Sequence, residues 1–271
     1  MEPLLEVSGL CKEFGGLRAI KDLSFAIYPG QVKSVIGPNG AGKTTLFRMI
    51  TGIVKPTTGK IRMAHASLNG LRPHQVAERG IASTFQTVEL FGEMTALENV
   101  MVGRHVRTRS ELFASGLRLA GMRREEDEIR EMALEKLDFV GLLDKENLKA
   151  HSLSLGEQKS LEIARALATG PRLLLLDEPA GGLNDRETER LAERISAIRD
   201  QGITVLLVEH DMNLVMNISN DIVVINYGEK IAEGPPEAIK DNQAVVDAYL
   251  GEAIDYSDLR RLERDTVETY S

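Results

Sequence analysis

The chain has 271 residues, enough to bury a substantial hydrophobic core in one large domain or two small ones. Acidic residues exceed basic ones by 41 to 33, and the net charge of −8 argues against a general nucleic-acid-binding protein. The single cysteine, Cys11, excludes an intramolecular disulfide and fits a reducing compartment.

No segment of the sequence is expected to enter a membrane. The first residues lack the basic stretch and apolar region of a secretory signal. The longest apolar runs, such as Leu173–Leu176 and Val205–Val208, are far shorter than the roughly 18 residues that span a bilayer. Any membrane role is therefore expected to be peripheral and to need a separate membrane partner.

Two strands are expected near the N-terminus. Short segments at Leu4–Val7 and Leu23–Ile27 are typical of strands, and Gly15-Gly16 lies between them as a turn. A β-branched run at Gln31–Ile36 then leads into glycines, and helical spacing follows at 43–51. A strand, a glycine-rich turn and a helix in this order suggest a nucleotide-binding α/β unit.

The glycine-rich turn matches the phosphate-binding pattern G-x-x-x-x-G-K-[ST]. Glycines allow consecutive backbone N–H groups to turn inward around an anion, and the positive N-terminus of the following helix adds to the attraction. Lys43 supplies a charged donor to the outer phosphates, and the Thr44 hydroxyl is suited to ligate Mg²⁺. A chance match in a chain of this length is expected on the order of one time in a hundred. The candidate nucleotide-binding residues here are Gly37, Pro38, Asn39, Gly40, Ala41, Gly42, Lys43, Thr44 and Thr45.

A different pattern runs from Thr95 to about Ala150. Within it, residues 125–140 place apolar side chains at helical spacing among many charges. These side chains are Ile129, Met132, Ala133, Leu137 and Val140. The pattern predicts a small helical subdomain.

Strand-like apolar runs and helical stretches alternate in the rest of the chain. The runs lie at Leu173–Leu176, Ile203–Val208 and Ile222–Ile225, and the helical stretches at 157–169 and 185–200. This alternation predicts an α/β fold with buried parallel strands and helices on the faces of the sheet.

Two acidic residues, Asp177 and Glu178, directly follow the run Leu173–Leu176. An apolar strand delivers them to the carboxyl edge of a parallel sheet, where such folds bind ligands. Asp177 suits the Mg²⁺ shell, through water, and Glu178 suits a general base or a group that positions water. The alternative is an acidic cap at a helix start, and the phosphate loop upstream weakens it. His210, after the run Ile203–Val208, is a candidate sensor of the terminal phosphate, either as a donor to it or by orienting the base, although a single histidine at a strand end is usually structural or solvated.

The segment Leu153–Gln158 and the helical stretch that follows it resemble the signature of ABC transporter ATPases. Ser154 and Gly156 precede a helix whose N-terminus offers a second phosphate site. An ordinary helix start, with Ser154 and Glu157 as a capping box, explains the same residues, and both interpretations can hold together. In the family, the phosphate loop and the signature meet across a head-to-tail dimer. The resemblance therefore implies that Ser154 and Gly156 bind the ATP that a second ATPase subunit holds, either an identical chain or a close homologue.

The resemblance covers the chain to about Ala253. It implies the fold of a P-loop NTPase of the ABC type: a nucleotide-binding domain with an antiparallel β subdomain and a helical subdomain. The domain is expected over 1–253, with its helical subdomain at about 95–155, and a C-terminal extension at 254–271. That extension is rich in charge, so it is either a solvated helix or a regulatory or dimer contact.

Family roles map onto individual positions of this sequence. Phe14 is similar to the aromatic residue that stacks on adenine, although a single phenylalanine is more often part of a core. Gln86 is similar to the glutamine that touches Mg²⁺ and the attacking water and senses the membrane partner, and Gly181–Asn184 resembles the segment that crosses between subunits. The implied catalytic residues are Glu178, His210 and Gln86, and the implied Mg²⁺ ligands are Thr44, Gln86 and Asp177.

Several segments resemble the ATPases of branched-chain amino acid importers, and the LivG type more than the LivF type. They are Phe85-Gln86, Leu90–Thr95, Glu98–Val100, Glu209–Met212, Leu214–Met216 and Ala248–Ala253. A long insert at about 104–124 also suits the LivG type. The resemblance implies a peripheral ATPase on the cytoplasmic side of the inner membrane, bound to integral-membrane permease subunits and served indirectly by a solute-binding protein. Transport of urea or amides, transport of lipopolysaccharide, a non-transport ABC function on ribosomes or DNA, and a small-molecule kinase are the alternatives.

Four positions depart from the common family pattern. Leu155 and Glu157 stand where the signature most often has Gly and Gln, while Ser154 and Gly156 are kept. Asn184 replaces the usual Asp of the crossing segment, and Asp185 follows it where Pro is common. These departures concern the coupling between sites and leave the phosphate-binding residues in place.

Overall fold

An antiparallel sheet forms the N-terminal part of the molecule. A computed structural model describes residues 2–112 and 119–249, with side chains described outside 105–125. Strands β1 (Leu5–Phe14) and β2 (Leu17–Ile27) form the hairpin expected around Gly15-Gly16. Strands β4 (Thr58–Met63) and β5 (Ala66–Ser67) extend it in the order β2-β1-β4-β5.

A second, six-stranded sheet carries the centre of the molecule, in the order β10-β9-β3-β8-β7-β6. All of its strands except the edge strand β10 pair in parallel. The strands are β3 (Val32–Ile36), β6 (Ile81–Ser83), β7 (Leu173–Asp177), β8 (Thr204–Val208), β9 (Asp221–Asn226) and β10 (Glu229–Gly234). The parallel arrangement predicted from the three apolar runs is confirmed.

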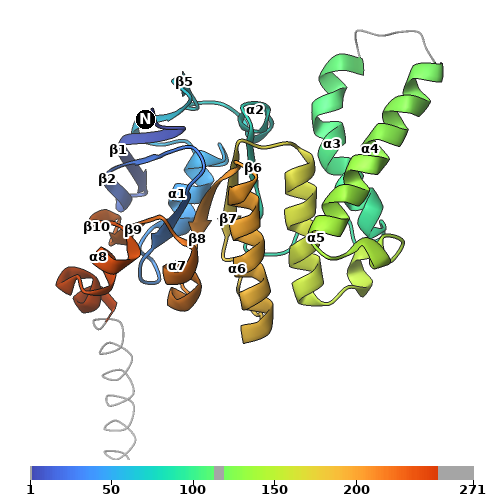
Figure 1. Cartoon of the computed structure of the whole chain (residues 1–271). Coiled ribbons are helices and arrows are strands. Elements are labelled where there is room, and N and C mark those ends of the chain that lie inside the picture. The colour runs from blue at the N-terminus through green and yellow to red at the C-terminus, as the bar shows by residue number, and fades with distance from the viewer. Residues whose placement is uncertain (1, 113–118, 250–271) are drawn as a thin grey trace, which may run out of the picture.

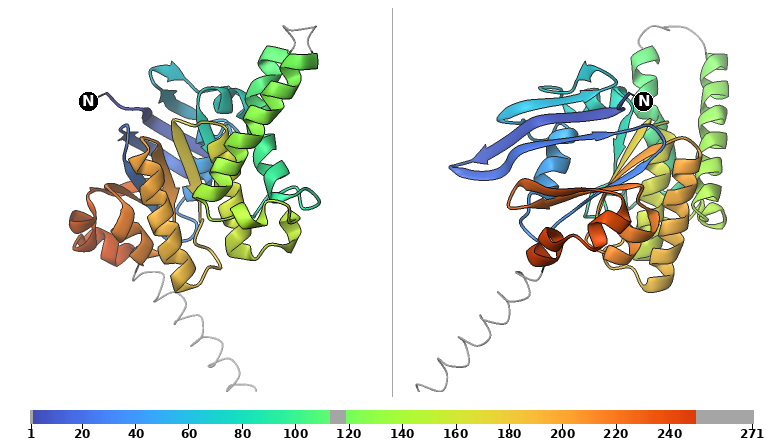
Figure 2. Two further views of the ribbon diagram at one scale, coloured as in Figure 1. Left: turned by 45° about the vertical axis from the view of Figure 1, so that its right-hand side comes forward. Right: turned by 60° about the vertical axis from the view of Figure 1, so that its left-hand side comes forward.

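Helices cover both faces of this sheet (Figure 1). Helix α1 (Lys43–Ile50) lies on one face, and α5 (Leu155–Ala168), α6 (Asp185–Asp200) and α7 (Met212–Ile218) lie on the other. The antiparallel sheet lies on the α1 side, away from α5 and α6 (Figure 2). Two short helices, α2 (Pro73–Glu78) and α8 (Pro236–Lys240), follow β5 and β10 along the chain.

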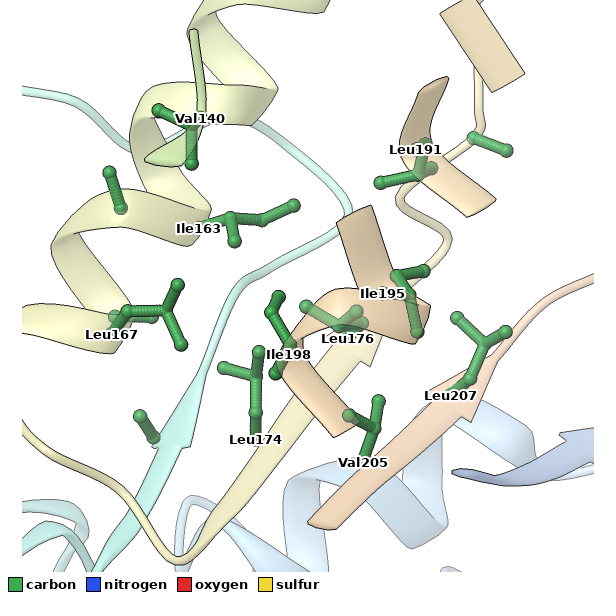
Figure 3. Packing of buried hydrophobic residues seen from close by; sticks show 14 of the residues in the cluster. Val140, Ile163, Leu167, Leu174, Leu176, Leu191, Ile195, Ile198, Val205 and Leu207 are labelled. Atoms are coloured by element: carbon green, nitrogen blue, oxygen red, sulfur yellow. The ribbon is translucent and has the colours of Figure 1, made fainter. Parts of the chain in front are cut away.

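Strand β7 shows why the central strands read as continuous apolar runs. Leu174 and Leu176 point toward the helices α5 and α6 (Figure 3), and Leu173 and Leu175 belong to the core on the α1 side. All four leucines are fully buried. Burial of each contributes about 1.5 to 3 kcal/mol. Burial on both faces therefore holds β7 in place, and with it the positions of Asp177 and Glu178 at its end.

Two long helices extend away from the sheet beside α5 (Figure 1). They are α3 (Ala96–Leu112) and α4 (Leu119–Phe139), and two 3-10 turns, η1 (Leu143–Lys145) and η2 (Ala150–Ser152), lead back to α5. The apolar stripe predicted for α4 packs inward, with Ile129, Ala133 and Leu137 buried. Helix α3 approaches α5 closely at Gly103, where a Cβ atom would lie 2.3 Å from the Arg165 carbonyl oxygen.

Sequence patterns predicted the long elements better than the short ones. The expected strands and helices are present, and most of their ends differ by one or two residues. The two N-terminal strands and the helix predicted over 125–140 are six or seven residues longer at one end than expected, as β1 (Leu5–Phe14), β2 (Leu17–Ile27) and α4 (Leu119–Phe139). Strands β4, β5, β6 and β10 and helices α2, α7 and α8 were not predicted. The subdomain boundary at about 95–155 stays a prediction, and the extension 254–271 and part of the insert 104–124 lie outside the described residues. None of the helices in the described ranges has the length and apolar character that crossing a membrane requires.

Candidate functional site

The glycine-rich loop lies between β3 and the start of α1. Gly37 has a φ of 153°, and a Cβ atom there would lie 2.0 Å from the carbonyl oxygen of Ile225 on β9. Gly42 is the N-cap of α1, with a φ of 107°, and no side chain caps this helix in the described structure. The first-turn N–H groups of α1 therefore face the loop without a side-chain acceptor, as an anion-binding helix start requires.

Lys43 holds its ammonium group within this loop. Its Nζ donates hydrogen bonds to the carbonyl oxygens of Gly37, at 2.6 Å, and Pro38, at 2.9 Å. The side chain is only 7% exposed. A positive charge and a row of backbone N–H groups thus lie at one place, which is suited to a polyphosphate.

A cavity of about 720 Å³ opens beside the loop. The candidate residues in its lining are Phe14, Asn39, Gly40, Ala41, Gly42, Lys43, Thr44, Thr45, Gln86 and Glu178. The Phe14 ring is 46% exposed, so it is not a core residue, and the Lys12 ammonium lies 4.6 Å from the ring centroid. Arg18 and Tyr227, which sequence reasoning did not select, also line the cavity.

Asp177 ends β7 as a buried carboxylate, 4% exposed. Burial raises the pKa of Asp177 to about 6, the negative charge of Glu178 adds to this rise, and the positive charges of Arg48 and Lys43 oppose it. The Oδ1 atom has no hydrogen-bond partner in the described structure, which leaves an acceptor for a metal-bound water. No three His, Cys, Asp or Glu side chains gather at a metal site in the described ranges.

Three segments converge on the Glu178 side chain. Gln86 donates a hydrogen bond from Nε2 to Glu178 Oε2 at 2.7 Å. His210 Nδ1 lies 3.8 Å from the same oxygen. Glu178 itself has a positive φ of 47°, a strained conformation for a residue other than glycine. The structure thus brings together the glutamine, glutamate and histidine that the sequence had selected one by one.

Ser154 and Gly156 lie at the start of α5 and do not line the cavity around Lys43. The capping box is present: Glu157 donates its N–H to Ser154 Oγ, and Ser154 donates its N–H to Glu157 Oε2 at 3.0 Å. A Cβ atom at Gly156 would lie 2.7 Å from Glu187 Oε1, so the Glu187 side chain would have to shift to admit one. A single copy of the chain therefore presents the phosphate loop and the capped helix start as separate features.

A family model described as ABC transporter matches residues 20–181. The chain belongs to the ABC transporter family. A second model, described as a branched-chain amino acid ATP-binding cassette transporter, matches residues 229–255. This ABC protein is therefore an ATP-binding, ATP-hydrolysing enzyme.

Full-length relatives of this ABC ATPase are known. BraF of Pseudomonas aeruginosa, a high-affinity branched-chain amino acid transport ATP-binding protein, is 48% identical over 93% of this chain and 99% of BraF. LivG of Escherichia coli, with the same description, is 47% identical over 93% of this chain and 99% of LivG. The ADP conformation of an ATP-binding cassette of an ABC transporter matches with a TM-score of 0.80 and 30% identity, over 93% of this chain and 100% of that one.

Sequence reasoning missed two buried charged residues of this ABC ATPase that bind the backbone of the segments carrying Glu178 and His210. Glu209 is fully buried and Lys159 is 8% exposed. A signal for Glu209 was present, since it directly follows a buried strand that leads to His210. For Lys159 the sequence offered no signal, because its partners lie on another segment of the chain.

Proposed function

We propose that this chain is the ATP-hydrolysing subunit of an importer of branched-chain amino acids. The observation that carries the proposal is the similarity to BraF and LivG over nearly the whole chain. The match of residues 229–255 to a branched-chain amino acid cassette model supports the same substrate class.

The phosphate loop binds the triphosphate in this proposal. Lys43 and the N–H groups at the start of α1 hold the phosphates, and Phe14 stacks on the base at the cavity mouth. Thr44, Gln86 and Asp177 would hold Mg²⁺, which neutralises charge on the outer phosphates. The unpaired Oδ1 of Asp177 supports this assignment.

Hydrolysis needs a water molecule placed in line with the terminal phosphate. Glu178 accepts a hydrogen bond from this water or takes its proton, and Gln86 and His210 fix the orientation of the Glu178 carboxylate. Positioning of this kind is the main contribution that a protein makes to phosphoryl transfer.

A second ATPase subunit completes the site. Ser154 and Gly156 of the facing subunit bind the same triphosphate through the exposed start of α5. Leu155, 45% exposed between them, offers an apolar contact for this association.

A groove between the sheet and the long helices offers a docking place for permease subunits. It has a volume of about 310 Å³ and is lined by residues of α2, β6, α3 and α5. Ile53 and Phe91, about half exposed, supply apolar surface at this groove. Phe85 also lines the groove, so a partner bound there contacts the neighbour of Gln86. This docking would place the chain on the cytoplasmic face of the membrane, with a solute-binding protein acting only through the permease.

Replacing Glu178 by glutamine tests the hydrolytic role. Glu178→Gln is expected to bind ATP as the parent does, to lose at least about a hundredfold in kcat, and to accumulate as an ATP-bound dimer. Steady-state ATPase assays and size-exclusion chromatography with ATP measure these outcomes. An unchanged ATPase rate would remove Glu178 from its role.

The facing-subunit contact has its own test. In the Glu178→Gln background, Ser154→Arg is expected to block the ATP-dependent dimer while each chain still binds nucleotide. Ser67→Arg, at an exposed position on β5, is the matched control and is expected to dimerise like its parent. Dimers that persist with Ser154→Arg would contradict the head-to-tail arrangement.

Reconstitution tests the transported substrate. The chain is purified with the membrane proteins that bind it, and the complex is placed in vesicles with its solute-binding protein. ATP-dependent uptake of leucine is the expected result. Uptake of urea, or extraction of lipopolysaccharide, in place of leucine uptake would reject the substrate class and keep the ATPase assignment.

A further inference from the structure

We propose that Glu209 and Lys159 are positioning residues that hold Glu178 and His210 in one geometry and connect them to the signature helix α5. The inference rests on the roles proposed above for Glu178 and His210, and it adds two residues that touch neither ATP nor water.

Glu209 binds the backbone of two separate loops. Its Oε1 accepts a hydrogen bond from the N–H of Ala180 at 2.7 Å, just after Glu178 and Pro179. Its Oε2 accepts from the N–H groups of His210, at 2.9 Å, and Asp211, at 3.3 Å. One buried carboxylate thus fixes the loop that follows Glu178 relative to the loop that carries His210.

Lys159 reaches the same place from α5. Its Nζ donates hydrogen bonds to the carbonyl oxygens of Glu178, at 3.1 Å, and Pro179, at 3.0 Å. Because Glu178 has a positive φ, its backbone needs such support to keep the strained conformation. The carboxylates of Glu209 and Glu178 also interact electrostatically with the Lys159 ammonium.

The hydrogen bonds of Glu209 and Lys159 indicate that these residues position Glu178 and His210 and do not only stabilise the fold. Glu209 and Lys159 interact electrostatically, and buried charges of opposite sign add little net stability compared with apolar residues of similar volume, because desolvation offsets the attraction. Every hydrogen bond from this pair ends on the backbone of a segment that carries or flanks Glu178 or His210. Glu209 Oε2 also lies 3.6 Å from His210 Nδ1.

The arrangement gives the signature segment a direct connection to hydrolysis within one subunit. Lys159 lies on the helix that Ser154 caps, about one turn further along. When Ser154 engages the nucleotide held by the facing subunit, any displacement of α5 is transmitted through Lys159 to the Glu178 backbone of the same chain. Each subunit's own site thereby responds to the occupancy of the opposite one.

The test uses Glu209→Gln, Lys159→Met and the double variant in the full chain, with ATPase kinetics and fluorescent-nucleotide titration. Each single change is expected to lower kcat by about tenfold or more while KM and the number of nucleotides bound per chain stay within about twofold. Because the two residues act as one unit, the double variant is expected to match the worse single variant. If Lys159→Met does not yield folded protein, Lys159→Gln, which removes the positive charge and shortens the side chain, replaces it.

Lys33→Met is the matched control. Lys33 is also a buried lysine, bound to the Ala26 carbonyl and to the carboxylates of Asp221 and Glu233, and these three partners lie outside the segments that carry Glu178 and His210. This control is expected to lower Tm and to leave kcat per bound nucleotide unchanged.

Three results would overturn the inference. They are an unchanged kcat in both single variants, a fall in nucleotide stoichiometry that accounts for the lost rate, and a double variant whose defect is the product of the two single defects. Glu178→Gln is measured in parallel. An unchanged kcat in that variant rejects the assignment of Glu178, whereas the expected loss of kcat beside a normal Glu209→Gln rejects only the positioning role.

Discussion

Asp177 offers a quantitative test of the buried site without any ligand. The carboxylate is 4% exposed, its Oδ1 lacks a hydrogen-bond partner in the described structure, and its pKa is raised to about 6, chiefly by burial. The change Asp177→Asn removes the ionisable group and keeps the shape of the side chain. In the nucleotide-free protein, ionisation of Asp177 is expected to lower the free energy of unfolding as pH rises. We expect Asp177→Asn to remove this pH-dependent loss.

The size of this effect comes from linkage between protonation and folding. An acid with a folded pKa above its unfolded value binds its proton more tightly in the folded state, so stability falls as pH rises between the two values. For Asp177 these values are about 6 and 3.8. This difference, about 2.2, corresponds to a total cost of about 3 kcal/mol above pH 6. About 1 to 2 kcal/mol of that cost accrues between pH 5 and pH 8.

Urea denaturation in the presence of a metal chelator measures the effect. Because the chain has no tryptophan, unfolding is monitored by far-UV circular dichroism. Between pH 5 and pH 8 the parent is expected to lose about 1 to 2 kcal/mol more free energy of unfolding than Asp177→Asn. The control Asp138→Asn, at an exposed position on α4, is expected to follow the parent. Parallel pH profiles for the parent and Asp177→Asn would refute the reasoning that burial of this carboxylate controls its ionisation.

Three further changes test other parts of the structure. Phe14→Ala is expected to raise KM for ATP about tenfold with little change in kcat, because stacking on a base contributes about 1 to 3 kcal/mol; steady-state kinetics decide. Gly37→Ala is expected to abolish nucleotide binding in a titration, since its Cβ would lie 2.0 Å from the Ile225 carbonyl oxygen. Arg194→Met is expected to lower the free energy of unfolding by about 1 to 3 kcal/mol, since the Val140 carbonyl loses its donor. Equal urea midpoints for this variant and the parent would contradict it.

The parts of the fold and site that sequence could predict are those with local causes. The phosphate loop was predictable because only glycine tolerates the backbone at Gly37 and Gly42. Strand β7 was predictable because a strand covered on both faces is apolar at every position, and Asp177 at its end then had to lie at the sheet edge. Each of these signals is complete within about ten residues.

The parts that sequence could not predict depend on contacts between distant segments. Strand β10 is polar and only partly buried, and it forms by pairing with β9 at the edge of the sheet. The role of Lys159 depends on the carbonyl groups of Glu178 and Pro179, which any residue would carry. A hydrogen bond to a backbone atom leaves no trace in the identity of the acceptor residue, so no pattern of residue types reveals it.

The unusual Asn184-Asp185 pair has a local explanation. Asn184 caps α6: its Oδ1 accepts from the N–H of Glu187 at 3.1 Å, and its own N–H donates to Glu187 Oε2 at 3.0 Å. The first turn of α6 already carries the negative charges of Asp185 and Glu187, which suit the positive helix end. A third carboxylate at position 184 would add repulsion and no further hydrogen bond to this cap, whereas asparagine caps about equally well. Asn184 therefore caps α6 without placing a third negative charge in its first turn. The same segment approaches α5 closely, since a Cβ atom at Gly182 would lie 2.9 Å from Leu155 Cδ2.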